Sequence, residues 1–199
     1  MSQYIPSENV IASRRGTIGA LFHARVPANP DHWAVIAGDR TLSYTELEDR
    51  SNRLANSLLA MGLSRGDRVG MLARNCLEYL EVELAAAKTG IILACLNWRL
   101  GDRELTHCIN LVEPKVIIVQ SALTETLDRL DLHPHRRIVI GDDYEEFLAA
   151  GSNSYPDLDL DPEDGLVILY TSGTTGLPKG ALVSHRAMIA RAMCFTSEF

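Results

Sequence analysis

Residues 165–180 read Gly-Leu-Val-Ile-Leu-Tyr-Thr-Ser-Gly-Thr-Thr-Gly-Leu-Pro-Lys-Gly, and this stretch decides the fold class of the 199-residue chain. Its first six residues form a short apolar run, which predicts a buried strand. Glycines, hydroxyl side chains and a lysine follow, which predicts a loop at the carboxyl end of that strand. Open α/β sheets bind ligands at this edge, so the stretch predicts an α/β fold with a ligand site here.

The loop has the composition of a polyphosphate-binding site. Glycines let the backbone approach a ligand closely, converging backbone N–H groups form an anion site, and a lysine neutralises further phosphate charge. The candidate phosphate-binding residues are Thr171, Ser172, Gly173, Thr174, Thr175, Gly176, Lys179 and Gly180. The competing interpretation is an ordinary surface loop. The preceding strand, the lysine and the density of hydroxyl groups all count against it.

This loop differs from the P-loop of kinases and GTPases. In that motif a glycine precedes the lysine and a serine or threonine follows it. Here Pro178 precedes Lys179, and Gly180 follows it. Proline has no N–H to offer a phosphate, and the hydroxyl that holds magnesium in P-loop proteins is missing. A kinase or GTPase is therefore a poor alternative.

The loop resembles the signature loop of adenylate-forming enzymes, the superfamily of acyl-CoA synthetases, luciferases and peptide-synthetase adenylation domains. Other segments are similar to the family pattern, and the resemblance runs from about residue 17 to the end of the chain. These segments are Leu42-Ser-Tyr-Thr-Glu-Leu47, Gly66-Asp-Arg-Val-Gly70, Asn75-Cys-Leu-Glu78, Lys88-Thr-Gly90, Leu96-Asn-Trp-Arg-Leu100 and Glu104-Leu105. The segment Asn97-Trp-Arg-Leu100 favours the acyl- or aryl-CoA ligase branch.

The resemblance implies a two-step reaction. A carboxylate attacks the α-phosphorus of ATP to give an acyl-adenylate and pyrophosphate, and coenzyme A thiolate then displaces AMP. By the same resemblance, the loop grips the β- and γ-phosphates, Lys179 stabilises the charge of pyrophosphate, and Thr171 lies close to magnesium. The implied ligands are ATP, magnesium, coenzyme A and a fatty or aryl carboxylic acid.

Members of this family are much longer than this chain. Their later segments complete the adenine and acyl pockets, supply an acidic magnesium ligand and add a mobile C-terminal domain with its own catalytic lysine. We therefore expect the chain to be the N-terminal portion of a ligase that is inactive alone and self-associates through apolar surface. The alternative is a complete short protein that binds a nucleotide or a partner chain without chemistry.

The composition is that of an ordinary globular protein with a sizeable core. It is 46% hydrophobic and 23% charged, with a net charge of −7, which argues against nucleic acid or an anionic membrane as a partner. The N-terminus does not resemble a secretory signal. The longest apolar region, Leu84 to Leu96, contains Lys88 and is too short to span a bilayer. We expect a cytoplasmic protein without a transmembrane segment.

The cysteines predict no metal site and no redox motif. The four cysteines lack CxxC spacing, and Cys76, Cys95 and Cys108 lie in apolar stretches, which predicts buried free thiols. His133-Pro-His135 has residues that bind metals, but an exposed turn is the preferred interpretation.

Three further residues near these motifs leave alternatives open. His185 either approaches a nucleotide or serves the first turn of a helix. Trp98 and Arg99 either line a pocket or, as we expect, pack locally.

Apolar runs alternate with helix-like segments along the chain, which predicts a largely parallel sheet with flanking helices. Strands are predicted at 33–37, 41–43, 68–72, 91–96, 115–119, 137–140, 165–170 and 181–183, and helices at 44–61, 75–88, 102–113, 121–130 and 186–199. Ser43 and Glu46 have capping-box spacing, Asn75 and Asp102 are expected to open helices, Ser184 is expected to cap the last helix, and Leu77, Leu80 and Leu84 are expected to point inward. No G-x-G-x-x-G motif supports a dinucleotide-binding enzyme.

The chain divides into four predicted parts. These are an N-terminal tail (1–16), an α/β subdomain (17–150), an acidic linker (151–164), and a region (165–199) that holds the strand, the phosphate-binding loop and the truncated start of the next subdomain. The linker acids lack EF-hand spacing, so a solvated connector is preferred over a metal site. The last predicted helix reaches Phe199 without a glycine or proline stop, which favours truncation.

Overall fold

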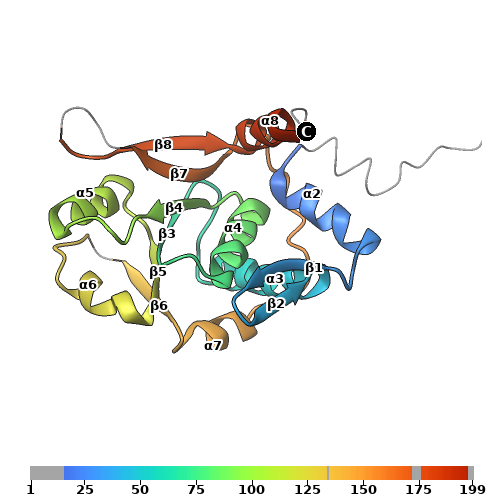
Figure 1. Ribbon diagram of the computed structural model, residues 1–199, viewed down its shortest axis with the longest axis horizontal. Helices are drawn as coiled ribbons and strands as arrows, with labels where there is room; N and C mark the ends of the chain where they lie inside the picture. The colour runs from blue at the N-terminus through green and yellow to red at the C-terminus, as the bar shows by residue number, and fades with distance from the viewer. Residues whose placement is uncertain (1–15, 134, 172–175, 197–199) are drawn as a thin grey trace, which may run out of the picture.

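The computed structural model describes residues 16–133, 135–171 and 176–196, and its centre is a six-stranded sheet with helices on both faces (Figure 1). The strands of this sheet are β3 (Arg68–Leu72), β4 (Ile92–Leu96), β5 (Val116–Gln120), β6 (Arg136–Ile140), β7 (Gly165–Thr171) and β8 (Lys179–Ser184), and a separate antiparallel pair consists of β1 (Trp33–Ala37) and β2 (Arg40–Ser43). The helices are α2 (Ile18–Arg25), α3 (Tyr44–Ala60), α4 (Leu77–Thr89), α5 (Asp102–Val112), α6 (Thr124–Asp128), α7 (Tyr144–Ala149) and α8 (His185–Thr196), with the 3₁₀ segments η1 (Val26–Ala28) and η2 (Ser121–Leu123).

The strand order β6-β5-β3-β4-β7-β8 confirms the predicted α/β class with a largely parallel sheet. Pairing is parallel from β6 to β7, and only the last strand in this order, β8, is antiparallel to its neighbour. The chain steps from β3 to β4 and then crosses back over β3 to β5, so the direction of winding reverses at β3. Leu72 is level with both Leu96 and Val119, so these parallel strands end together at one edge.

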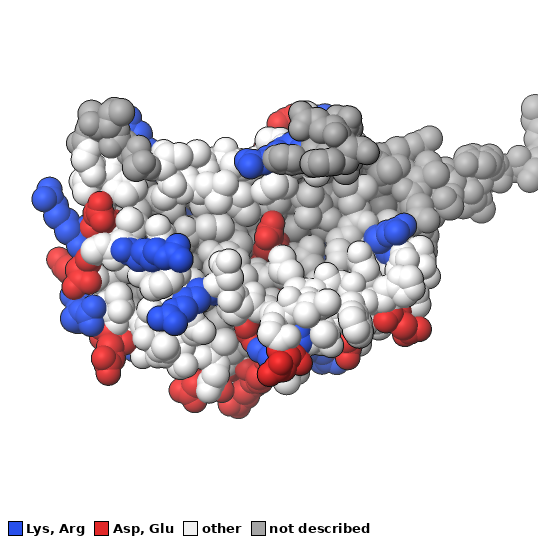
Figure 2. All heavy atoms as spheres, viewed as in Figure 1, with Lys and Arg blue, Asp and Glu red and all other residues white. Residues whose placement is uncertain are grey.

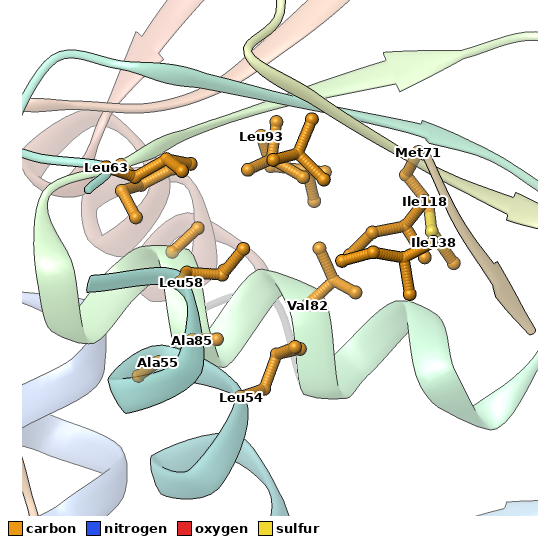
Figure 3. Close-up of a cluster of buried hydrophobic side chains, with 14 of the residues drawn as sticks. Leu54, Ala55, Leu58, Leu63, Met71, Val82, Ala85, Leu93, Ile118 and Ile138 are labelled. Carbon is orange, nitrogen blue, oxygen red and sulfur yellow. The ribbon is translucent and has the colours of Figure 1, made fainter. Parts of the chain in front are cut away.

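The larger hydrophobic core lies between the sheet and the helices α3, α4 and α7. Figure 3 shows Leu54 and Leu58 of α3 pointing toward side chains of α4 and of four strands. A second core, on the other face, contains Leu105 and Ile109 of α5. Alternate strand residues serve the two faces, as a pleated sheet requires. The sheet is therefore buried on both sides, which explains its continuous apolar strands.

The predicted capping box at the start of α3 is confirmed. The Ser43 hydroxyl accepts from the Glu46 N–H at 3.2 Å, and the Glu46 carboxylate accepts from the Ser43 N–H at 2.7 Å. Two of the other predicted helix starts are wrong by one residue. The N-cap of α4 is Cys76 instead of Asn75, and the N-cap of α5 is Gly101 instead of Asp102.

The shift at α5 has a visible cause. The Glu104 carboxylate accepts from the Gly101 N–H at 3.3 Å, so the acid at the third helical position satisfies that donor. Asp102 consequently lies inside the first turn, where a negative charge favours the helix dipole.

The predicted inward face of α4 is wrong at Leu80, which is 36% exposed, whereas Leu77 and Leu84 are buried. The helix packs against α3 as well as the sheet. The buried face of α4 therefore contains Glu81, Val82 and Ala85, since Ala85 is four and three positions from the other two and so lies on the same side of the helix. Leu80 lies on the remaining side of the helix, away from both contacts.

Shorter helices were harder to predict. The predicted helix 121–130 is a 3₁₀ turn followed by the five-residue α6, and neither α2 nor α7 was expected. The helix predicted at 186–199 is present as α8 up to Thr196. Residues 197–199 of that prediction lie outside the described residues.

The segment 151–164 contains neither helix nor strand, but its first part is fixed to α3. The side-chain amide of Asn52 donates to the Asn153 carbonyl at 2.9 Å, and that of Asn56 donates to the carbonyl of Ser152 at 2.8 Å. Only glycine fits at position 151, because a Cβ atom there would come within 2.1 Å of the Arg53 carbonyl oxygen. The predicted connector is thus packed at its start and exposed at Asp157, Asp159, Asp161 and Glu163, whereas Asp164 is half-buried and pairs with Arg65. Since β7 pairs with β4, the segments before and after it contribute to one sheet.

Candidate phosphate-binding site

The predicted phosphate-binding loop joins β7 to β8 at the carboxyl edge of the parallel strands (Figure 1). Thr171 and Lys179 pair across the base of this hairpin, so they bracket the loop from opposite arms. Ser172, Gly173, Thr174 and Thr175 lie outside the described residues. Gly176 has φ of 109°, a conformation that favours glycine over residues with a side chain.

Lys179 is available for a ligand. Its side chain is exposed, and no ion pair engages it within the described parts of the chain. Thr171 is exposed beside it. Gly180 lies close to the neighbouring arm, since a Cβ atom there would meet Ile168 Cγ2 at 3.0 Å. The described ends of the loop thus offer one cation and one hydroxyl to solvent.

Both arms of the hairpin are anchored to α5. The Tyr170 hydroxyl donates to the Cys108 carbonyl oxygen at 2.9 Å, and the His107 Nε2 lies 3.1 Å from the carbonyl oxygen of Pro178. Pro178 is buried, although Lys179 next to it is exposed. The hairpin base is held while its charged residue faces outward.

Two arginines lie at the same edge of the sheet. Arg74 follows β3 and Arg99 follows β4, and each guanidinium carbon lies 4.8 Å from the centre of the Trp98 ring. Trp98 also packs against the second core, which confirms the predicted local packing of Trp98 and Arg99. Figure 2 shows Lys and Arg side chains over α5 and α6 interspersed with Asp and Glu side chains, and two of the arginines are paired there, Arg129 with Asp102 and Arg137 with Asp128. The positive charge at this edge therefore comes from the two arginines stacked on Trp98 and from Lys179.

Arg74 was not recognised from the sequence. The available signal was its position two residues after a predicted strand, the same offset as Trp98 from β4. Adjacent parallel strands bring such positions together, but their order had to be known first.

His185 lies at the opposite end of β8 from the loop (Figure 1), so the interpretation that it approaches a nucleotide is wrong. It is buried, and its Nδ1 accepts from the Ile18 N–H at 3.2 Å. Burial lowers the pKa of His185, against an opposing effect of Asp164. It serves the first turn of α8, whose predicted cap is confirmed because the Ser184 hydroxyl accepts from the Ala187 N–H at 3.3 Å.

Cys76, Cys95 and Cys108 are free thiols, and of these three only Cys108 is fully buried. Cys76 and Cys95 are half-buried, so the prediction of burial is only partly right for them, since both line the margin of the larger core. Burial raises the pKa of each of these three thiols to about 11. They are therefore protonated at neutral pH and are poor nucleophiles.

Metal-binding side chains do not gather in the part of the chain that the structure describes, where no three His, Cys, Asp or Glu residues form a cluster. His133 is exposed, and its carbonyl lies 3.0 Å from His135 Nδ1. Pro134 between them lies outside the described residues. Thr171 carries a hydroxyl oxygen of the kind that binds Mg²⁺, and a single such donor fits an ion that phosphate oxygens and water would mainly hold.

Across the described ranges, none of the helices combines the length and apolar character needed to cross a bilayer.

A sheet that winds in both directions, with a lysine-containing glycine loop at its carboxyl edge, defines an α/β protein of the nucleotide-binding type. The chain belongs to the AMP-binding enzyme family, whose model matches residues 22–198.

Similar proteins of known activity are acid–thiol ligases. The chain is 34% identical over 180 residues to the fatty acid–[acyl-carrier-protein] ligase ScoC of Streptomyces coeruleorubidus, covering 89% of this chain and 34% of the relative. It is 37% identical over 161 residues to a feruloyl-CoA synthase of an Amycolatopsis species, covering 81% of this chain and 32% of the relative. The chain therefore spans about a third of the length of these relatives, and its family is that of AMP-forming acid–thiol ligases.

Solved structures agree with the fold. The inhibitor-bound N-terminal domain of FACL13 from Mycobacterium tuberculosis superposes with a TM-score of 0.78 at 30% identity, covering 85% of this chain and 44% of that one. A fatty acyl CoA synthetase of the same organism gives a TM-score of 0.83 at 25% identity, covering 96% of this chain and 38% of that one.

Proposed function

We propose that this chain supplies the triphosphate-binding part of an acyl-CoA synthetase that activates a carboxylic acid as an acyl-adenylate and transfers it to coenzyme A. The observation that carries the proposal is the hairpin loop from Thr171 to Gly180. It stands at the carboxyl edge of the sheet with Lys179 exposed and unpaired among the described residues. Family membership and the ligase relatives support the reaction class.

The chemistry requires positive charge at this edge. A carboxylate approaching a triphosphate is repelled by it, and charge accumulates on the departing pyrophosphate as the bond to the α-phosphorus breaks. Lys179 and the N–H groups of the loop stabilise that charge, because preorganised donors act most strongly where charge develops. Lys179 has no role as a general base in this scheme.

Thr171 is the proposed protein ligand of magnesium. Magnesium, when bound, neutralises part of the triphosphate charge. The Thr171 hydroxyl lies beside the base of the loop, where it can reach an ion held by the phosphates.

The proposed carboxylic acid is a fatty or aryl acid. The relatives act on fatty acids and on a feruloyl group, as their names state. Coenzyme A is the proposed acceptor, although one relative is named for transfer to an acyl-carrier protein. The proposed place of the reaction is the cytoplasm, where both ATP and coenzyme A are available, and fractionation of the producing cells checks this.

ATP–pyrophosphate exchange tests the proposed reaction. Exchange that depends on an added fatty or aryl acid is expected from a protein that carries this chain together with the remaining two thirds found in its relatives, and Lys179→Ala is expected to abolish it. The 199-residue chain alone is expected to bind MgATP without exchange. Exchange that is unchanged in the Lys179→Ala variant would remove the role given to this lysine. Nucleotide binding without exchange, even in the longer protein, favours the alternative of a non-catalytic nucleotide-binding protein.

We also propose that the chain self-associates through β8. This strand ends the sheet, and neighbouring apolar side chains are exposed, including Leu182 at 60% and Leu111 at 52%. Unpaired strand edges of this kind invite pairing. Antiparallel pairing of two copies would bring Lys179 of each near Ser184 of the other. Glu163 and Asp164 lie beside Ser184, because the next residue, Gly165, is the pairing partner of Ser184. In the proposed dimer, Lys179 of each copy would therefore lie near these two acidic residues of the other copy.

Light scattering on the eluting protein measures this association. A dimer is expected for the wild-type chain and a monomer for Leu182→Glu, which places a charge on the exposed face. Leu158→Glu is the matched control, since Leu158 is also exposed but lies outside the sheet. A monomeric wild-type chain at high concentration contradicts the proposal.

A further inference from the structure

A single turn of α5 holds both arms of the β7–β8 hairpin next to its loop. On the first arm, the Tyr170 hydroxyl donates to the carbonyl oxygen of Cys108 at 2.9 Å. On the second arm, His107 Nε2 lies 3.1 Å from the carbonyl oxygen of Pro178. The imidazole must be the donor there, because a carbonyl oxygen can only accept. His107 and Cys108 are adjacent in sequence, so the two contacts share one rigid support.

The residues at these contacts are less exposed than the residues that face the ligand edge. Pro178 is buried, and Tyr170 is partly buried against the second core. Thr171 and Lys179, which directly follow Tyr170 and Pro178, are exposed. Each anchor is therefore followed by a residue that the proposed function assigns to the phosphates or their metal.

We propose that His107 and Tyr170 are positioning residues for the phosphate-binding loop. They fix the backbone on both sides of it, and so set where Lys179 and Thr171 present their charge and hydroxyl. This inference rests on the proposed function of the loop. Neither residue touches the phosphates in this scheme. Their effect arises because an anion site is effective only when its donors are held in place before the ligand arrives.

Binding of inorganic pyrophosphate with magnesium, measured by titration calorimetry on the 199-residue chain, tests the inference. His107→Leu removes the imidazole that donates to the Pro178 carbonyl, and Tyr170→Phe removes the hydroxyl that donates to the Cys108 carbonyl. Each is expected to weaken the affinity about two- to tenfold, the range that corresponds to one lost hydrogen bond. His107→Gln keeps an N–H donor and is expected to stay within about twofold of the wild-type affinity.

The matched control is Asn110→Ala on the same helix. The Asn110 amide donates to the Asp131 carbonyl at 2.9 Å, away from the hairpin. A positioning role predicts lower pyrophosphate affinity in His107→Leu but not in Asn110→Ala. A merely structural role predicts that both variants unfold at lower urea concentration while their affinity stays unchanged, and that result overturns the inference.

Hydrogen exchange without any ligand separates this inference from the proposed function. The amides of Gly176, Leu177, Lys179 and Gly180 are expected to exchange faster in His107→Leu than in the wild-type chain, and at the wild-type rate in Asn110→Ala. Equal rates in all three proteins overturn the positioning role. Absence of pyrophosphate binding by the wild-type chain, or binding unaffected by Lys179→Ala, instead contradicts the phosphate role of the loop.

Discussion

The α3–α4 helix pair and the β7–β8 hairpin give a lysine opposite environments, one buried and paired, the other exposed. Between the helices, Lys88 is buried, and its ammonium donates to Glu48 at 2.7 Å, Ser51 at 2.6 Å and Asn52 at 2.8 Å. In the hairpin, Lys179 is exposed and without an ion pair in the described ranges. A buried charge must have its partners within the fold, whereas an exposed, unpaired charge can meet a ligand. The two lysines therefore predict two kinds of mutational effect, one on stability and one on binding.

The largest expected effect is a loss of stability at Arg50, whose guanidinium pairs with one buried and one exposed carboxylate. Arg50 pairs with the fully buried carboxylate of Glu81 at 2.6 Å and with the Glu145 carboxylate, whose side chain is 61% exposed, at 2.7 Å. Glu81→Gln is expected to lower the free energy of unfolding by about 3–5 kcal/mol, because it removes the buried carboxylate of the pair and leaves Arg50 only the exposed carboxylate of Glu145. Glu145→Gln is the matched control and should cost about 0–1 kcal/mol. Urea unfolding measures both, and equal losses would contradict the importance of burial.

The second prediction concerns the pH dependence that Lys88 confers. Burial lowers the pKa of Lys88 to about 8, while Glu48 opposes the shift. A lysine in an unfolded chain has a pKa of about 10.4. Between pH 8 and that value, Lys88 therefore carries a proton in the unfolded chain that it lacks in the folded chain. The contribution of Lys88 to the free energy of unfolding should therefore rise from pH 8 to pH 10, by at most about 3 kcal/mol. The raised thiol pKa values of Cys76, Cys95 and Cys108 act in the opposite direction over this range, so the Lys88 contribution has to be measured by itself.

Comparison with Lys88→Met isolates this term. The stability difference between the wild-type chain and Lys88→Met should shift in favour of the wild type as the pH rises. Lys115→Met is the control, because Lys115 is half exposed and pairs with Asp67 at the surface. A difference that stays constant between pH 7.5 and pH 10 shows that Lys88 remains charged throughout.

The third prediction concerns Lys179 in the β7–β8 hairpin. Lys179→Ala is expected to weaken pyrophosphate binding by about 1.5–3 kcal/mol, the usual contribution of a hydrogen bond to a charged group. Its unfolding free energy should change by less than about 0.5 kcal/mol, because the side chain is exposed. Calorimetric titration and urea unfolding on the same samples measure the two quantities. A large loss of stability in Lys179→Ala would contradict the proposal that Lys179 serves binding while Lys88 serves stability.

The smallest effect is expected at Arg74. This exposed cation stacks on Trp98 at the carboxyl edge of the sheet, and Arg74→Ala should weaken pyrophosphate binding by up to about 1 kcal/mol, since solvent screens exposed charges. Arg136→Ala is the matched control, as this exposed arginine begins β6 at the opposite edge. Equal effects of the two variants would mean that only the overall charge matters.

The sequence predicted the regions whose physical cause is local. Strand runs of apolar residues and the Ser43–Glu46 box were confirmed because a few adjacent residues determine them. Leu80 was misplaced because helical spacing alone does not show that α4 is covered by α3 as well as by the sheet. The same limit applies to the candidate site. The composition of the loop is local, but the support by His107 and the proximity of Arg74 to Trp98 depend on the order of strands, which no single segment encodes.

The bond between the Ile18 N–H and His185 Nδ1 spans 167 positions and links the first described helix to the last. Contacts this distant in sequence form late, because most of the intervening chain must be in place first. During synthesis, α2 must therefore wait for His185, the first residue of α8, to leave the ribosome before it reaches its final partner. Pulse-labelling during refolding should find the Ile18 amide among the last to gain protection, and early protection there would rule out this order of assembly.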